Sequence, residues 1–318
     1  LFNDLKYTKL LKLNFLSVSF QILFNLYMLI LRFQRKSKIY FFVMLLNFLL
    51  NFLITFILIK YYNYGLYSPI FGTVIPFSII LIFLTIYLRS YFTFNIDYKY
   101  LKSMLSFGIQ SSIMGVLLFN LDWIDRLIIK QYLGLESVGL YTFAYKIGAL
   151  ISVIFVFPFS FIWSPMRMEY FKEKNYDQLF TNVISLYTVL GSLIILFSIF
   201  FGESILNLII TNKNYFESIK IFPIIMIGLF LHGYNNLLDF GIHISKKLYF
   251  IIFIYIIGIL INFSLNIILI PRFGYFVAAY VTLITYFLCS LFIHLISIKF
   301  YMIKPKFRST LLPILILI

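Results

Sequence analysis

Long apolar segments restrict this chain to folds that cross a membrane. Nine such segments follow one another, and each has about the 20 residues needed to span ~30 Å of hydrocarbon as a helix. They cover residues 10–31, 38–60, 67–88, 105–129, 139–163, 181–201, 219–240, 247–270 and 276–298. Lipid offers the backbone no hydrogen bonds, so consecutive segments of this kind cross as helices. The sequence therefore predicts an all-α, polytopic membrane helix bundle.

Composition excludes several other classes of protein. The chain is 62% hydrophobic and 12% charged, whereas soluble domains are about 25% charged. Its net charge of +15 comes from basic residues between apolar segments, where topology and lipid headgroups explain them better than nucleic acid does. A single cysteine, Cys289, excludes a disulfide framework, and the three histidines lack metal-ligand spacing. We expect no cofactor, metal or nucleic-acid partner.

The basic residues also predict the orientation. Alternate loops divide into a set with 16 Lys and Arg and a set with 8, and the richer set is cytoplasmic by the positive-inside rule. This places residue 1 outside, so we expect an odd number of spans before Leu1. The first apolar run is long enough to span and does not read as a cleavable signal peptide.

A weak internal repeat predicts how the spans are grouped. The tetrapeptide KIYF at 38–41 matches KLYF at 247–250, an offset of 209 residues. The same offset aligns Gly65 with Gly274 and Thr73 with Thr282. Both copies begin at a predicted cytoplasmic loop and reach glycine at an external turn, which indicates a repeat unit of six spans.

This repeat leads to a domain hypothesis. Residues 1–95 form the second half of an N-terminal lobe with three spans, residues 96–300 form a six-span C-terminal lobe, and residues 301–318 begin a further span. The two lobes are pseudo-symmetric, and three spans should precede Leu1. Parallel six-span repeats are typical of transporters, with the substrate path between the halves. No external loop is long enough for a catalytic domain, and GxSxG and HExxH are absent, so we expect no enzyme.

One charge cluster lies within apolar sequence. Asp122, Asp125 and Arg126 share a helix face by their spacing, and Lys146 follows inside the next span. A charge at mid-bilayer costs roughly 2.5–3.5 kcal/mol on insertion scales, so such residues usually face partners or a hydrated cavity. We predict that these four residues line the substrate or ion path. The alternatives are an Asp122–Arg126 pair closing a helix end, and a Lys146 that snorkels to the headgroups.

Other polar residues suggest weaker hypotheses. Asp239 and His243, at the cytoplasmic end of the seventh span, would form a cytoplasmic gate or a solvated helix end. Two spans carry an asparagine pair four residues apart, for which interhelical hydrogen bonding is the default: Asn47 with Asn51, and Asn262 with Asn266.

Further features concern local structure. Residues 165–180 predict an interfacial amphipathic helix on the cytoplasmic face, and 203–208 predict a short external half-helix. Three prolines can kink or end helices: Pro158, Pro165 and Pro223.

The order of motifs from the fourth span into the fifth resembles a known family. An apolar helix ends in Asp122 or Asp125 and continues through Leu-Ile-Ile at 127–129, then Leu-Gly at 133–134, Val-Gly at 138–139, Tyr141 and Ala144. Pro158, Pro165 and Tyr170 follow at similar spacing. This resembles the polysaccharide biosynthesis flippases (Wzx-type) of the multidrug/oligosaccharidyl-lipid/polysaccharide exporter superfamily.

The resemblance implies two six-helix lobes around a cavity in the bacterial cytoplasmic (inner) membrane. It implies alternating access that moves an undecaprenyl-diphosphate-linked oligosaccharide outward for O-antigen, capsule or exopolysaccharide synthesis. It also implies membrane lipids and polysaccharide polymerase machinery as partners. Family members use basic residues for the anionic substrate, and Arg126 and Lys146 are the residues that would match that role.

Two alternatives stay open. One is a cation-coupled multidrug exporter of the same superfamily, with Asp122 or Asp125 as the cation site; an acidic rather than basic cavity would favour it. The other, from a different class, is a membrane-embedded polysaccharide polymerase or ligase. That function would need a sizeable external loop with convergent polar residues.

Overall fold

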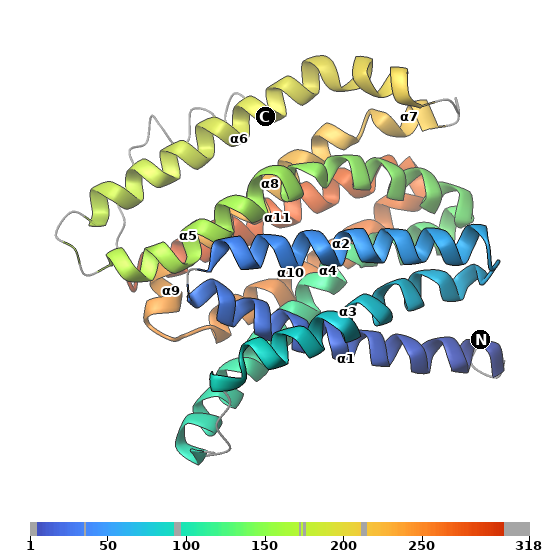
Figure 1. The fold of residues 1–318 in the computed structure, drawn as a ribbon. Coiled ribbons are helices and arrows are strands. Elements are labelled where there is room, and N and C mark those ends of the chain that lie inside the picture. Colours follow the sequence, from blue (N-terminus) through green and yellow to red (C-terminus); the bar gives the residue numbers. More distant parts are fainter. Residues whose placement is uncertain are drawn as a thin grey trace. The chain divides into compact units, whose positions relative to one another are not determined.

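A computed structural model describes residues 5–34, 36–91, 97–171, 173, 176–210 and 215–301. Every regular element in these ranges is helical, and eight helical stretches are long and apolar enough to cross a membrane. The predicted all-α polytopic bundle is thereby confirmed (Figure 1). The chain divides into two compact units, Leu1–Asp97 and Tyr98–Ile318, which we describe separately. The assignment of these units to lobes of a six-span repeat stays a prediction.

The fourth and fifth predicted spans are not separated by the expected loop at 130–138. Helix α4 runs from Tyr98 to Gly148 and leaves helical geometry at Gly134, with φ 83° and ψ 179°. That conformation is essentially restricted to glycine. Tyr141 bonds Asp125 and Tyr145 bonds Asp122, so the two arms of α4 run antiparallel. One glycine therefore reverses the chain where a nine-residue loop was predicted.

The Leu1–Asp97 unit is built on three long helices, α1 (Leu5–Phe33), α2 (Ser37–Lys60) and α3 (Ser68–Tyr87). Short 3-10 turns, η1 (Gly65–Tyr67) and η2 (Arg89–Tyr91), flank α3. Helix α3 packs against both α1 and α2. Gly72 permits the close approach to α2, because a Cβ at that position would collide with Thr55.

The Tyr98–Ile318 unit begins with α4. A π-helical turn, η3 (Ser152–Val156), leads into α5 (Phe157–Tyr170), and α6 (Tyr176–Ile209) and α7 (Phe216–Ile219) follow. The last four helices are α8 (Phe222–Leu238), α9 (Phe240–Ile244), α10 (Tyr249–Phe273) and α11 (Phe276–Ser297). Helix α11 packs against α8 and α10, and α10 packs against α4. The α10–α11 turn at Gly274, with φ 76° and ψ −175°, has the same backbone geometry as Gly134.

Several local predictions were wrong. No separate interfacial helix covers 165–180, since α5 continues to Tyr170 and α6 begins at Tyr176. Likewise, 203–208 is the last part of α6. Of the three prolines expected to kink or end helices, Pro158 closely follows the π-helical turn η3 and Pro165 lies inside α5. Pro223 lies in the first turn of α8, where proline is tolerated because its missing N–H has no intrahelical partner. Residues 302–318, nearly all of the predicted further span, lie outside the described residues.

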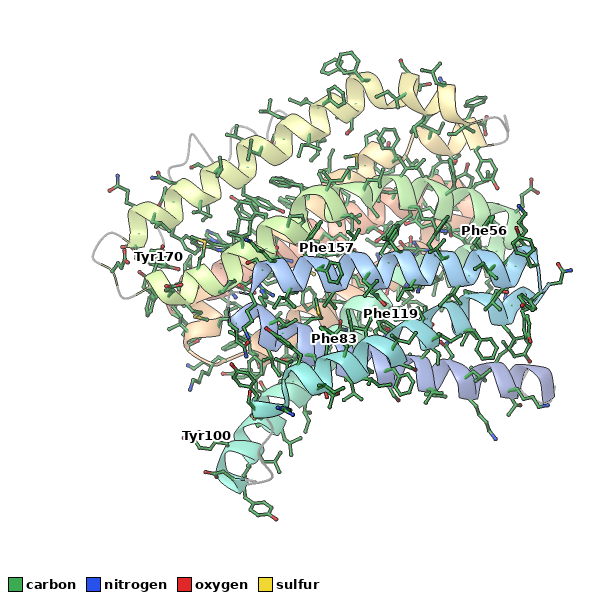
Figure 2. The ribbon with its side chains drawn as sticks, in the orientation of Figure 1. Phe56, Phe83, Tyr100, Phe119, Phe157 and Tyr170 are labelled. Carbon is green, nitrogen blue, oxygen red and sulfur yellow. The ribbon has the colours of Figure 1, made fainter. Side chains whose placement is uncertain are left out.

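Large apolar side chains cover much of the surface of each unit. Figure 2 shows aromatic side chains projecting from the helices, among them Phe56, Phe83, Phe119 and Phe157, and all four are exposed. Contiguous exposed apolar surface on this scale is incompatible with a monomer in water but suits lipid as the surrounding solvent.

Candidate substrate and ion path

Asp125 is the centre of the most buried polar cluster in the Tyr98–Ile318 unit, with 0% exposure. Its carboxylate accepts three hydrogen bonds of 2.7 Å, from the Tyr141 hydroxyl, the Asn266 amide and the Thr282 hydroxyl. These donors come from the second arm of α4, from α10 and from α11. One carboxylate thus joins four helical segments, and the short turns at Gly134 and Gly274 place those segments around it.

The asparagine pair of α10 extends this cluster. Asn266 donates to both Asp125 and the Asn262 side-chain oxygen, 2.9 Å away, and Asn262 donates at 3.5 Å to Thr285. Both asparagines are fully buried. Their default role, interhelical hydrogen bonding, is observed here, with a buried carboxylate as one partner.

Asp122 forms a second cluster one turn earlier on α4. Its Oδ1 accepts hydrogen bonds from the hydroxyls of Tyr145, at 2.9 Å, and Tyr286. The Tyr286 ring lies 4.9 Å from the imidazole of His232, measured between centroids. Asp122 and Asp125 were predicted to share one face of a helix. Both carboxylates do contact the second arm of α4 and helix α11, but they bond different residues there.

Arg126 is enclosed by aromatic rings. Its guanidinium carbon lies 4.7 Å from the Trp123 ring, 5.7 Å from Tyr141 and 4.3 Å from Tyr145. The guanidinium donates to the backbone carbonyl of Asp122 rather than to its carboxylate, and only 8% of the residue is exposed. Cation–π contacts therefore replace the ion pair that would close the helix end.

Lys146 lies apart from this cluster. It occupies the last turn of α4 and is exposed, although its neighbour Tyr145 points into the Asp122 site. Consecutive helical residues face different directions, so the sequence proximity of these residues does not bring the lysine to the carboxylates.

A third polar cluster lies at the end of the unit predicted to be cytoplasmic. Asp239, at the junction of α8 and α9, forms a 2.7 Å ion pair with Arg167 of α5 and a 3.1 Å contact with His243. Arg167 also donates at 2.6 Å to the Asn236 carbonyl. Burial alone would raise the pKa of Asp239, but Arg167 and His243 outweigh it and hold the pKa below the ordinary 3.8. The predicted pair Asp239 and His243 is thus brought together, through a buried arginine.

The sequence identified the charged residues of the site better than it identified the side chains that form hydrogen bonds or ion pairs with them. Tyr141 appeared only in a family motif and Thr282 only as a repeat position. Arg167 counted only among the basic residues of the predicted cytoplasmic loops, and Tyr145 and Tyr286 carried no signal. Tyrosine is too frequent in this chain, at 25 of 318 residues, for a single hydroxyl to stand out. Among the described residues, no three His, Cys, Asp or Glu side chains group in a way that could hold a metal ion.

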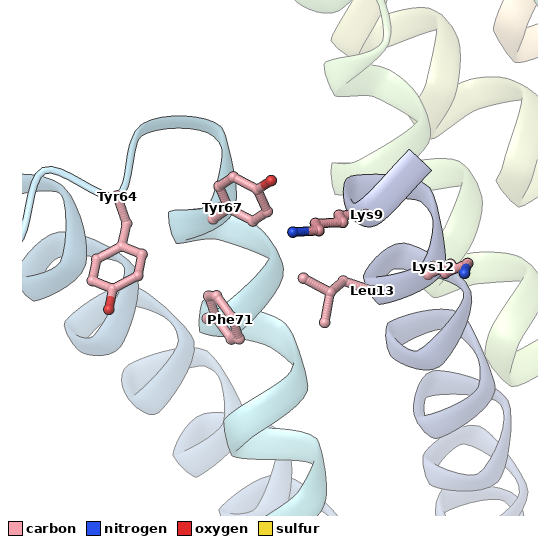
Figure 3. Close-up of a pocket in the computed structure, with 6 residues that line it drawn as sticks. All are labelled: Lys9, Lys12, Leu13, Tyr64, Tyr67 and Phe71. Carbon is pink, nitrogen blue, oxygen red and sulfur yellow. The ribbon is translucent and has the colours of Figure 1, made fainter. Parts of the chain in front are cut away.

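The Leu1–Asp97 unit contains a pocket of about 550 Å³ between the first turns of α1 and the η1–α3 segment. Figure 3 shows Lys9 and Leu13 of α1 reaching toward Tyr67 and Phe71. Lys9 is exposed, and Leu13, Tyr67 and Phe71 are only partly buried. None of the predicted path residues lines this pocket, and it lacks a buried polar group.

Comparison with known proteins gives one result. The model of a family described as polysaccharide biosynthesis protein matches residues 1–215, a range that includes both arms of α4 and the Asp122, Asp125, Arg126 and Lys146 positions. No curated protein and no solved structure matches the chain significantly. The chain therefore belongs to the polysaccharide biosynthesis protein family, as a multi-pass membrane member with a role in polysaccharide synthesis or export.

Proposed function

We propose that this protein is a flippase that moves lipid-diphosphate-linked oligosaccharide repeat units across the membrane by alternating access. The observation that carries the proposal is the family match over residues 1–215, together with eight membrane-length helices in the part of the chain that the structure describes. A membrane-spanning member of a polysaccharide pathway, with charge buried among its helices, suits transport of a polar cargo. In this proposal the protein makes and breaks no covalent bond.

The Asp125 cluster would provide the conformational element that such a cycle requires. Its carboxylate has partners on α4, α10 and α11, so neutralising it weakens three interhelical contacts at once. A packed interior responds to such a change by switching between discrete arrangements rather than by gradual deformation. Ligand or ion binding at this carboxylate would therefore bias the helices between two states.

The two bases of the predicted path would serve the diphosphate differently. Lys146 is exposed and would act as a point charge without rearrangement. Arg126 is held in its aromatic enclosure, so its contact with a diphosphate requires the guanidinium to leave that site. Arginine would then bind phosphate oxygens in a bidentate manner.

One observation favours a second candidate, a cation-coupled exporter of the same superfamily. Asp125 is a fully buried carboxylate with the Thr282 hydroxyl oxygen beside it, and hard cations prefer oxygen ligands of this kind. In that case the acid would bind the coupling ion and the cargo would be an organic cation.

The test substitutes Arg126→Ala and Lys146→Ala in the full-length gene. The assay measures surface polysaccharide together with lipid-linked repeat units retained inside the cell. We expect less surface polymer and more retained intermediate, because the diphosphate loses its cationic contacts. Lys130→Ala is the matched control, since Lys130 is an exposed lysine of the same hairpin.

Three outcomes separate the candidates. Normal polymer from both variants would remove Arg126 and Lys146 from the substrate path. Normal polymer in a complete deletion, with new sensitivity to cationic drugs, would replace the flippase by the exporter. Loss of polymer without retained lipid-linked intermediate would point to the polymerase class.

A further inference from the structure

The Leu1–Asp97 unit has a groove between α1 and α3 that the proposed function does not use. Two cavities lie along this helix pair, one of about 550 Å³ near the start of α1 and one of about 450 Å³ farther along. We propose that this α1–α3 groove binds one anionic phospholipid, with the phosphate at Lys9 and Lys12 and an acyl chain along the two helices. A lipid site of this kind does not depend on what the protein transports.

The two cavities belong to one groove because their lining residues recur on a single face of each helix. Residues at such intervals lie on one side of a helix over several turns. On α1 these residues are Lys9, Leu13, Phe20 and Leu23, and on α3 they are Phe71, Ser78, Ile82 and Thr85.

Two hydrogen bonds hold α1 and α3 at a fixed distance along the groove. The Ser17 and Thr73 hydroxyls lie 2.8 Å apart, at positions between the two cavities. The Tyr27 hydroxyl lies 3.0 Å from that of Thr85, which lines the lower cavity. The groove is therefore preformed, and preformed cavities of roughly 300–1,000 Å³ with mostly apolar walls are typical of ligand sites.

The mouth of the groove is basic. Lys9 and Lys12 are exposed, and α1, α2 and α3 contain no acidic residue, so no carboxylate of these helices neutralises the two lysines. Figure 3 shows Lys9 pointing toward Tyr67 across the upper cavity. Ammonium and phenol groups both donate hydrogen bonds to phosphate oxygens, and lysines near a membrane surface attract anionic lipids. The mouth is therefore complementary to a lipid phosphate.

The length of the groove matches the hydrocarbon of one leaflet. Leu13 and Leu23 are ten positions apart on α1, which is about 15 Å of helix. Half of the ~30 Å hydrocarbon core is also about 15 Å. Leu23 and Ile82, which line the lower cavity, are 45% and 64% exposed. An acyl chain that starts below the lysines would cover this apolar surface.

A phospholipid fits the groove better than a lipid diphosphate does. The basic side chains that line the upper cavity are lysines, which act as point charges, whereas arginine is the residue suited to bidentate contact with a diphosphate. A phospholipid also reaches an exposed groove directly from the surrounding leaflet.

Native mass spectrometry of the full-length protein, released from detergent micelles, tests the headgroup contact. It measures the binding of phosphatidylglycerol and of phosphatidylcholine with the same acyl chains. We expect phosphatidylglycerol to bind about tenfold more tightly, because its headgroup is anionic. Lys9→Gln combined with Lys12→Gln should reduce this preference to about threefold or less. The matched control combines Lys60→Gln with Lys130→Gln, two other exposed lysines on the side predicted to be external, and should keep the preference.

A second pair of variants tests the acyl chain. Ile82 lines the lower cavity, whereas Ile79 is an exposed residue of α3 that lines neither of the two cavities. Ile82→Phe places a ring where the chain would lie and should weaken the binding of both lipids severalfold. Ile79→Phe should leave the binding of both lipids unchanged.

Several results would overturn the proposal. Equal loss of preference in the two double lysine variants, or a preference that persists without Lys9 and Lys12, would leave only general attraction between charges. Equal effects of Ile79→Phe and Ile82→Phe would remove the chain from the groove. Displacement of the lipid by inorganic phosphate, or tighter binding of a prenyl diphosphate, would assign the mouth to another ligand. A dimer that is lost in Ile82→Phe would assign the groove to a second copy of the chain.

Discussion

Thr73 and Thr282 are aligned by the internal repeat, yet the two units use them differently. In the Leu1–Asp97 unit, the Thr73 hydroxyl lies 2.8 Å from the Ser17 hydroxyl of α1. In the Tyr98–Ile318 unit, the Thr282 hydroxyl donates at 2.7 Å to the buried carboxylate of Asp125. In both cases the threonine joins neighbouring helices, but only one of the two partners is ionisable.

The same contrast holds for the rest of the two interiors. Among the described residues of the Leu1–Asp97 unit, the buried polar side chains are Ser17 and Ser68. The described residues of the other unit include four buried charged groups, Asp125, Arg126, Arg167 and Asp239. Buried charge is expensive in a membrane and marks function. Under the proposed function, this difference assigns the conformational switch to the Tyr98–Ile318 unit, whereas the first unit is held by apolar packing and neutral hydroxyls.

The largest expected effect comes from Arg167→Ala. Removing the arginine leaves Asp239 buried without its ion-pair partner, and breaking a buried pair costs roughly 3–5 kcal/mol. Chemical unfolding in detergent micelles measures this loss. Arg89→Ala in the first unit removes an exposed arginine of η2 and should change stability by less than about 0.5 kcal/mol. Equal effects from the two substitutions would abolish the contrast between the units.

The next effect is that of Asp125→Ala. The substitution removes three interhelical hydrogen bonds, and with an average of about 0.6 kcal/mol for each in membrane proteins the loss is roughly 2 kcal/mol. Ser17→Ala removes one neutral bond and should cost about 0.6 kcal/mol. Polysaccharide export should be lost in Asp125→Ala and retained in Ser17→Ala. Retained export in both variants would show that the carboxylate is structural.

A matched pair of isosteric substitutions sharpens the comparison directly. Thr282→Val and Thr73→Val each remove one hydroxyl and keep the side-chain shape. We expect a loss of about 1 kcal/mol for Thr282, whose bond is charge-assisted, and about 0.5 kcal/mol for Thr73. Unfolding midpoints of the two variants, measured under identical detergent conditions, give the difference. A larger loss for Thr73→Val would reverse our assignment of the stronger contact.

The smallest expected effect is a pH dependence. The folded-state pKa of Asp239 lies below its ordinary 3.8, so the stability it contributes is present above about pH 4 and is lost as pH falls through the folded pKa. Unfolding midpoints between about pH 5 and about pH 3 should fall, and Asp239→Asn should flatten that slope. The acidic residues of the first unit, Asp4 and Asp97, lie at its two ends, and positions 5 to 96 carry none. An unchanged slope in Asp239→Asn would assign the acid sensitivity to another group.

Much of the fold could be predicted because the bilayer imposes a length and a polarity on every span. Asp122, Asp125 and Arg126 were recognisable for the same reason, since charge within apolar sequence is conspicuous. The loop expected at 130–138 was wrong because hydropathy does not register a reversal that depends on the backbone of one residue, Gly134. The helix expected at 165–180 was wrong because amphipathic residues there extend α5 and α6.

The sequence by itself determined that this chain crosses a membrane as helices and that two acids and a base share one face of α4. Only the tertiary structure decided what those groups contact. Asp125 accepts hydrogen bonds from Asn266 and Thr282, which follow it in the chain by 141 and 157 positions. Arg167 pairs with Asp239, which follows it by 72 positions. Hydrogen-bond partners at such separations depend on how each helix is rotated against its neighbours. That rotation follows from side-chain packing, which local sequence patterns do not encode.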